Sequence, residues 1–198
     1  MLVALALGAC GAAARPTSST ACGPSSARTL AADHIARVYA TASAVYGCTR
    51  GASQRYKLGA VGPIREARVG SVALAATVVA YSQSTFGVDT ISSVVVVRRL
   101  SDGKQLADDP AFVGPLGPEF SESVQSVVTK RDGSAAWIVE GGSIVSQQST
   151  TEVVSLSAGR ERILDSGSGG GIDVKSLRLQ GSSLTWTHGG QTRSATLQ

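Results

Sequence analysis

The sequence predicts an all-β protein built from antiparallel strand meanders, and three observations support this. Apolar and polar residues alternate with period two, and helical spacing is scarce. Runs of β-branched residues are bounded by turns that contain Gly. A unit of strand, tight turn and second strand recurs about four times, as in the blades of a β-propeller. A β-sandwich or an open stack of meanders is the alternative.

The repeated unit is clearest in residues 123–137, where SVQSVVTKRDGSAAW consists of a strand, a turn and a second strand ending in Trp. Residues 173–186, 71–81 and 36–46 follow the same plan. A large aromatic residue at an equivalent place in each copy predicts a core anchor rather than a ligand platform. The predicted anchors are Tyr46, Tyr81, Trp137 and Trp186.

After its aromatic residue, each inner copy adds a second hairpin. Residues 93–106 turn at Asp102-Gly103, and residues 152–164 turn at Ala158-Gly159. Gly reaches the positive φ of such turns without strain. The stretches between these units, around 82–92 and 141–150, are expected to be loops on one rim.

The last copy is one strand short, whereas a strand predicted at residues 27–31 precedes the first copy. Pairing the two would close the ring and cover two sheet edges.

The N-terminal segment predicts export. Residues 2–9 are apolar and end in small residues, which is typical of a secretory signal and too short to span a bilayer. Leu7-Gly8-Ala9-Cys10 also resembles a lipobox, so both lipidation at Cys10 and simple cleavage remain open. We assign residues 1–21 to a leader and spacer and residues 22–198 to one all-β domain. The expected location is secreted or attached to the cell envelope, with membrane contact only through a lipid at the N-terminus.

Cys22 and Cys48 predict a disulfide, because an exported chain with two such cysteines favours one. A structural zinc site needs four ligands, and the candidates are limited to His34, His188 and three cysteines, with no C-x-x-C pair. We therefore predict no metal and no other cofactor.

Three segments carry a resemblance to a known group: residues 22–48, 123–138 and 176–197. They resemble uncharacterised exported proteins of high-GC actinobacteria that are similar to degenerate WD40-like or TolB-like β-propellers. The resemblance spans roughly residues 22–198. It implies a propeller-like fold and carries no catalytic residues to transfer.

The charge distribution argues against nucleic-acid binding. The chain has a net charge of +4 and a pI near 9.2, but its arginines are scattered along the sequence. A nucleic-acid interface gathers basic residues on one face with stacking aromatics between them.

Candidate catalytic motifs are weak. Ser101 and Lys104 match S-x-x-K by letter, but they lie across a predicted hairpin tip, where their side chains would diverge. His34 and His188 are interpreted as solvated turn residues. The Gly-rich stretch 165–173 resembles one copy of a calcium repeat, and one copy supplies too few oxygens, so we interpret it as a flexible linker. We predict no catalytic residue.

The most distinctive irregular segment is a predicted loop between the second and third copies. It contains two acids and two aromatics that form a candidate partner-binding loop: Asp108, Asp109, Phe112 and Phe120.

The function predicted from these observations is non-enzymatic. We expect an exported propeller-like module that binds a ligand or protein, or acts as a scaffold, at the cell envelope; its partner is an unknown protein or small ligand. The alternative is a cell-surface hydrolase that uses carboxylates from separate loops, and a third candidate is a calcium-stabilised structural protein.

Overall fold

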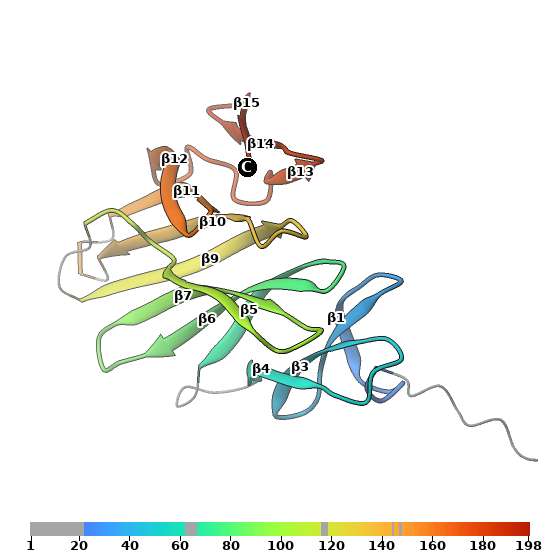
Figure 1. Cartoon of the computed structure of the whole chain (residues 1–198). Helices are drawn as coiled ribbons and strands as arrows, with labels where there is room; N and C mark the ends of the chain where they lie inside the picture. Colours follow the sequence, from blue (N-terminus) through green and yellow to red (C-terminus); the bar gives the residue numbers. More distant parts are fainter. Residues whose placement is uncertain (1–21, 62–66, 116–118, 144, 147) are drawn as a thin grey trace, which may run out of the picture.

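All regular structure in the described part of the chain is β-strand, which confirms the all-β class. The computed structural model describes residues 22–61, 67–115, 119–143, 145–146 and 148–198 (Figure 1). The strands are β1 (Arg28–Ala32), β2 (Ala36–Ala40), β3 (Ala44–Thr49), β4 (Tyr56–Ala60), β5 (Arg68–Ala75), β6 (Val78–Phe86), β7 (Ile91–Arg99), β8 (Gln105–Pro110), β9 (Phe120–Thr129), β10 (Ala135–Ser143), β11 (Ser149–Ser157), β12 (Arg160–Ser168), β13 (Arg178–Gln180), β14 (Ser183–His188) and β15 (Gln191–Thr196).

The strands pair as four consecutive antiparallel groups. We call β1–β4 the first group, β5–β8 the second, β9–β12 the third and β13–β15 the fourth. One parallel pair, Ala60 with Arg68, joins the first group to the second, and another, Ile91 with Ser121, joins the second to the third. These links merge the first three groups into one 12-stranded sheet, and the fourth group is a separate sheet.

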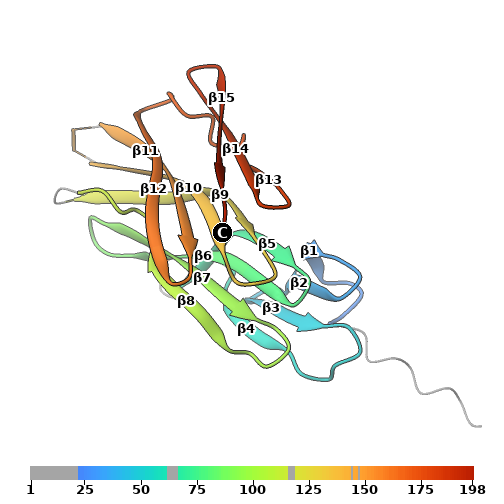
Figure 2. The same cartoon turned by 45° about the horizontal axis from the view of Figure 1, so that its top comes forward.

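The groups follow one another in space as they do in the sequence. In both views the blue first group and the red fourth group lie at opposite ends, with the green and yellow groups between them (Figures 1 and 2). The first strands of successive groups are in contact: β1 with β5, β5 with β9 and β9 with β13.

The strand expected to close the ring does not do so in the described residues. Arg28–Ala32 pairs with its hairpin neighbour β2 and is the first strand of the first group. The expected pairing with the last copy is therefore wrong. The fourth group does have three strands, as the short last copy predicted.

The aromatic anchors occupy the second strand of each group, with one correction. Tyr81, Trp137 and Trp186 lie on β6, β10 and β14 and are buried. In the first group the second strand is β2, and its fully buried aromatic is Tyr39. The predicted anchor Tyr46 lies on β3, is half-buried and stacks on Tyr39 with ring centroids 5.7 Å apart.

A separate apolar cluster fills each space between neighbouring groups. Tyr81 and Leu58 belong to the cluster between the first and second groups, and Trp137 to the cluster between the second and third. Ile138 and Trp186 belong to the cluster between the third and fourth groups. The second and third groups thus bury both faces by stacking on their neighbours, which is the physical reason for the repeat.

Two hairpins extend further than the sequence suggested. Residues 82–86 continue β6 and pair with 91–95 of β7, so that only 87–90 form the connection. In the same way 141–143 continue β10, although this stretch was expected to be loop. The stretches 82–84 (SQS) and 141–143 (GGS) contain no β-branched or aromatic residue, so little in the sequence indicates a strand there.

The stretch 173–177 is a turn, although a strand was predicted there. Asp173 Oδ1 accepts the backbone N–H of Lys175 at 3.0 Å, and the Ser176 hydroxyl donates to the Asp173 carbonyl at 2.6 Å. Such local side-chain bonds satisfy the backbone in place of a strand ladder. By contrast, the turns predicted at Gly103 and Gly159 are confirmed, with φ of 73° and 71°.

Candidate functional site

The residues of the predicted partner-binding loop are dispersed among regular elements. Asp108 and Asp109 lie in β8 and pair with Val96 and Val95 of β7, so the prediction of a loop is wrong for them. Phe120 begins β9 and is half-buried. Phe112 is buried in the core between the second and third groups.

Phe112 is a core residue because β10 leaves a place for its ring. A Cβ at Gly141 would lie 2.6 Å from Phe112 Cδ2. The neighbouring Ala111 carbonyl accepts the indole N–H of Trp137 at 2.6 Å. The segment after β8 is therefore fixed against β10, and the exposed aromatic surface expected there is not formed by Phe112.

Two buried carboxylates, Glu152 and Glu122, accept backbone N–H groups of the same segment. Glu152 of β11 accepts the backbone N–H groups of Val113 at 3.0 Å and Gly114 at 3.4 Å. Glu122 of β9 accepts those of Ser93 and Phe112. Burial raises the pKa of Glu122 more than these donors lower it, and the charge of Glu152 raises it further. Both carboxylates satisfy backbone donors of this segment, so we assign them a structural role.

A substitution at Gly141 should destabilise the protein by crowding Phe112. We expect Gly141→Ala to cost about 1–3 kcal/mol of unfolding free energy, since the ring must shift from a packed position. Urea unfolding followed by tryptophan fluorescence measures this cost. Adding Phe112→Leu should recover part of the loss, because the smaller side chain makes room. An unchanged urea midpoint for Gly141→Ala would show that Phe112 does not pack there.

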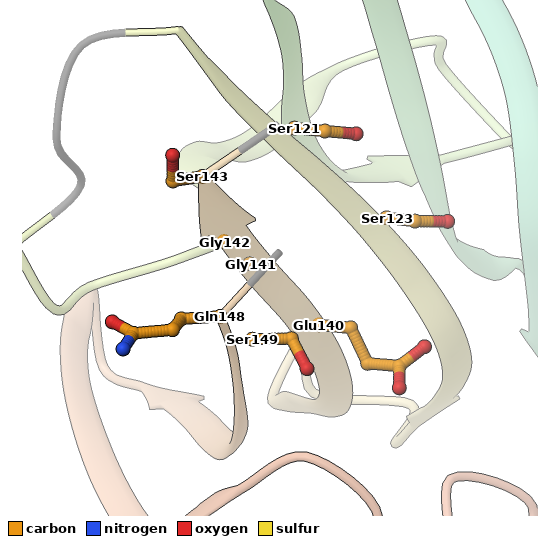
Figure 3. Close-up of a pocket in the computed structure, with 8 residues that line it drawn as sticks. All are labelled: Ser121, Ser123, Glu140, Gly141, Gly142, Ser143, Gln148 and Ser149. Carbon is orange, nitrogen blue, oxygen red and sulfur yellow. The ribbon is translucent and has the colours of Figure 1, made fainter. Parts of the chain in front are cut away.

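The strongest candidate for a binding site is a polar hollow on the third group, which we call the serine cleft (Figure 3). Its cavity volume is about 310 Å³. Strands β9, β10 and β11 and the β10–β11 connection supply its lining: Ser121, Ser123, Glu140, Gly141, Gly142, Ser143, Gln148 and Ser149. The cleft thus combines four hydroxyl groups, one amide and one carboxylate. Its two glycines contribute no side chain from β10 to the lining.

Strand pairing places these groups together. Ser123 lies opposite Glu140, and Ser121 lies opposite Gly142, which in turn pairs with Ser149. Side chains directly opposite each other in antiparallel strands share one face of the sheet. Figure 3 shows Ser121 and Ser123 pointing the same way from β9, with the Glu140 carboxylate below them.

Glu140 is the only charged residue among the described residues that line the serine cleft. Its Oε2 accepts the side-chain amide of Gln125 at 2.7 Å, which orients the carboxylate. Among the described residues Oε1 has no hydrogen-bond partner, and the side chain is half-buried. This oxygen is available to accept a donor from a bound molecule.

A second hollow of about 310 Å³ lies on the other side of β9. Residues of β5, β6 and β7 line it together with the stretch 121–124, so Ser121 and Ser123 border both hollows. Its carboxylate, Glu122, is already engaged by backbone donors, and Arg68 is exposed at its edge. This leaves the second hollow with less free hydrogen-bonding capacity than the serine cleft.

The densest polar cluster joins the third group to the fourth and centres on Asp165 of β12. Its buried carboxylate accepts the indole N–H of Trp186 at 2.7 Å and a guanidinium N–H of Arg193 at 2.8 Å. His188 Nδ1 lies 3.0 Å from Oδ2. Burial would raise the pKa of Asp165, but the hydrogen bonds of Trp186 and His188 and the nearby positive charges together lower it. The predicted flexible linker thus begins with a buried anchor.

His188 is not the solvated turn residue that the sequence suggested. It ends β14, its side chain is 22% exposed, and it contacts Asp165. An Asp–His pair activates a nucleophile only when a hydroxyl or thiol reaches the other ring nitrogen. The Nε2 atom of His188 faces Gly167, where an added Cβ would lie 3.1 Å from it. No described side chain forms a hydrogen bond with Nε2. The cluster therefore has the features of a structural joint. His34, by contrast, is exposed between β1 and β2, as predicted.

Asp109 of the second group and Glu161 of the third group form another pair of interacting acids. Burial raises the pKa of both Asp109 on β8 and Glu161 on β12, and the charge of Asp109 adds to the effect at Glu161. Glu161 Oε1 is buried without a partner. Neither acid lines the hollows beside β9. They therefore give no support to a reaction at those hollows.

The predicted disulfide is confirmed. Cys22 and Cys48 are bonded, both are buried, and their Cα atoms lie 5.7 Å apart. Such bonds persist in oxidising compartments, which indicates an extracytoplasmic environment. The candidate lipidation site Cys10 lies outside the described residues.

The described part of the chain contains neither a candidate group of metal ligands nor a helix that could span a membrane. No group of three or more His, Cys, Asp or Glu side chains there is arranged to hold a metal ion. No helix of the described residues is long and apolar enough to cross a membrane.

Comparison with known proteins gives a likeness to a solved structure. No family model and no curated protein matches the chain. Among solved structures it is similar to a subtype N10 neuraminidase-like protein of A/little yellow-shouldered bat/Guatemala/060/2010, with a TM-score of 0.43 and 13% identity. The match covers 82% of this chain and 50% of that one, so the chain spans about half its length.

Proposed function

We propose that the protein is an extracytoplasmic, propeller-like binding module that holds a small hydroxylated amine, of the class of amino sugars, in the serine cleft. The observation that carries this proposal is the lining of the cleft. The hydroxyls of Ser121, Ser123 and Ser149 and the Gln148 amide exchange hydrogen bonds with a hydroxylated molecule, and Glu140 attracts a cationic amino group. The Ser143 hydroxyl already accepts the backbone N–H groups of Val145 and Ser146, so it serves the ligand as a donor.

A propeller-like arrangement of about four blades is supported by the strand pairing. Each group is a meander, and the first strands of successive groups contact one another, as inner strands of neighbouring blades do. The serine cleft then lies on one blade, at the ends of its first three strands. Export is supported by the disulfide and by the predicted leader.

Binding is favoured over hydrolysis by the placement of the carboxylates. Glycoside hydrolysis needs two acids about 5–9.5 Å apart that flank the bond to be cleaved. Among the described lining residues, the serine cleft has a single acid, Glu140, and the second hollow has a single acid that is occupied by backbone donors. A lone carboxylate with surrounding hydroxyls holds a ligand without supplying an acid–base pair.

Isothermal calorimetry with glucosamine, and with glucose as the neutral comparison, tests the proposed function. We expect glucosamine to bind and glucose to bind at least several-fold more weakly, because only glucosamine offers an ammonium to Glu140. Glu140→Gln should weaken glucosamine binding about tenfold, the effect of removing a charge-assisted hydrogen bond.

The matched control is Asp89→Asn, which removes a negative charge from an exposed position in the β6–β7 turn outside the serine cleft. It should leave glucosamine binding within twofold of the unmodified protein. Equal weakening by both substitutions would indicate a general charge effect, and would contradict a site at Glu140.

A further inference from the structure

A groove that runs along the outer edge of the fourth group is distinct from the serine cleft. We call it the edge groove; its volume is about 570 Å³. Leu164 of β12 and Trp186 of β14 form its apolar lining, and Gln198 lies at its end. The remaining walls come from two strands that belong to different sheets, β12 and β15.

The edge groove borders backbone that has no strand beside it. β15 pairs with β14 on one side, and no described strand pairs with its other side. Four successive residues of β15, 193–196, line the groove, although neighbouring side chains of a strand point to opposite faces. A hollow that touches all four must therefore follow the edge of the strand, where unpaired N–H and C=O groups are presented.

Two charged side chains of the described residues line the edge groove, and both are cationic. Arg162 of β12 is exposed, and its guanidinium has no partner among the described residues. Arg193 of β15 is 48% exposed and uses one nitrogen, Nη1, to hold Asp165, so its other nitrogens remain available. Besides this pair of arginines, Ser194 and Thr196 also line the groove. Carboxylates are the natural complement of such a pair.

We propose that the edge groove binds an extended acidic peptide segment of a partner protein, which adds to β15 as a further antiparallel strand. The first three groups have four strands each and the fourth has three, so an added strand would give it the same number. Main-chain bonds to β15 supply affinity, and an acidic side chain that reaches Arg162 and Arg193 supplies selectivity. This site is independent of the proposed function, because it shares no lining residue with the serine cleft.

Fluorescence anisotropy with a labelled seven-residue peptide of alternating Thr, Glu and Val tests the proposal. A peptide with Gln in place of Glu, and glutarate as a free dicarboxylate, are the comparison probes. We expect the acidic peptide to bind at least tenfold more tightly than the neutral one. Hydrogen exchange should show new protection of β15 backbone amides when the acidic peptide is bound.

Arg162→Gln should weaken binding of the acidic peptide about tenfold. The matched control is Arg160→Gln, an exposed arginine on the same strand that does not line the edge groove and should change binding less than twofold. Circular dichroism checks that both variants are folded. Glu140→Gln should leave peptide binding unchanged, so that failure here is separable from failure at the serine cleft.

Three results would overturn the proposal. The first is equal binding of the acidic and neutral peptides. The second is binding of glutarate and peptide with no protection of β15, which would leave only an anion site. The third is protection of the β15 backbone amides in the free protein. If this protection depends on protein concentration, a second copy of the chain covers the edge of β15. If it does not, another part of the same chain covers that edge.

Discussion

Replacing Asp165 with Ala is expected to release the fourth group from the third. The carboxylate accepts hydrogen bonds from Trp186 and Arg193 and contacts His188, so it joins β12 to β14 and β15. Its loss leaves the buried indole N–H unpaired. We expect a cost of about 2–4 kcal/mol in unfolding free energy, by analogy with breaking buried, hydrogen-bonded pairs. Urea unfolding followed by tryptophan fluorescence measures it.

Asp165→Asn is the matched variant, because it keeps the shape and one acceptor oxygen while it removes the charge. It should be less damaging than Asp165→Ala. The substitution Asp89→Asn removes a charge from an exposed turn and should cost less than about 0.5 kcal/mol. If Asp165→Ala were as mild as Asp89→Asn, the two sheets would not depend on this carboxylate.

The contribution of Asp165 should also depend on pH in one direction. Its pKa in the folded protein is lowered, so its stabilising effect is complete above the pKa of the unfolded chain, about 3.9. The effect is lost as pH falls through the lower, folded-state pKa. The stability difference between the unmodified protein and Asp165→Asn should therefore be constant near neutral pH and shrink in acid.

The disulfide should have an effect of similar size. Closing the 26-residue separation between Cys22 and Cys48 reduces the entropy of the unfolded chain, which corresponds to about 3.5 kcal/mol of stabilisation in the chain-entropy model. The double variant Cys22→Ala with Cys48→Ala should lose about that amount in urea unfolding. The loss should centre on the first group, where the bond packs against Tyr39.

Arg37 provides a graded comparison for the disulfide. Its guanidinium donates to the carbonyls of Cys22, Pro24 and Ala27, at 3.2, 3.0 and 2.6 Å. Arg37→Gln should loosen the same segment at smaller cost, because the bond still holds Cys22. Thiol titration of the unfolded, unreduced chain of 198 residues should detect one free thiol, Cys10. Three free thiols would show that the bond is not formed.

Local signals made much of the fold predictable from the sequence. Asp102-Gly103 and Ala158-Gly159 turn as expected, because positive φ is a property of a few residues and needs no distant contact. The error at Tyr46 came from the register of the repeat. Period-two alternation looks alike in successive strands, so it does not show that β1 begins the first group or that β3 is the third strand of that group.

The polar centres were harder to predict because they depend on distant partners. Asp165 follows apolar residues near the end of a strand, and nothing local shows that Trp186 and Arg193 reach it. Glu152 offered a signal, since it directly precedes Val153 and Val154 in an apolar run. A charge in a strand that is otherwise buried points to a buried partner. The serine cleft gave no signal, because single serines in alternating strands are common.

The most direct measurement of the central claim is an amide chemical-shift map of the isotope-labelled protein during titration with glucosamine. A ligand in the serine cleft should shift the amides of residues 121–123, 140–143 and 148–149, and these shifts should be lost in Glu140→Gln at the same concentration. Shifts confined to the edge groove or the second hollow, or no shifts at millimolar glucosamine, would contradict the assignment of the serine cleft as the binding site.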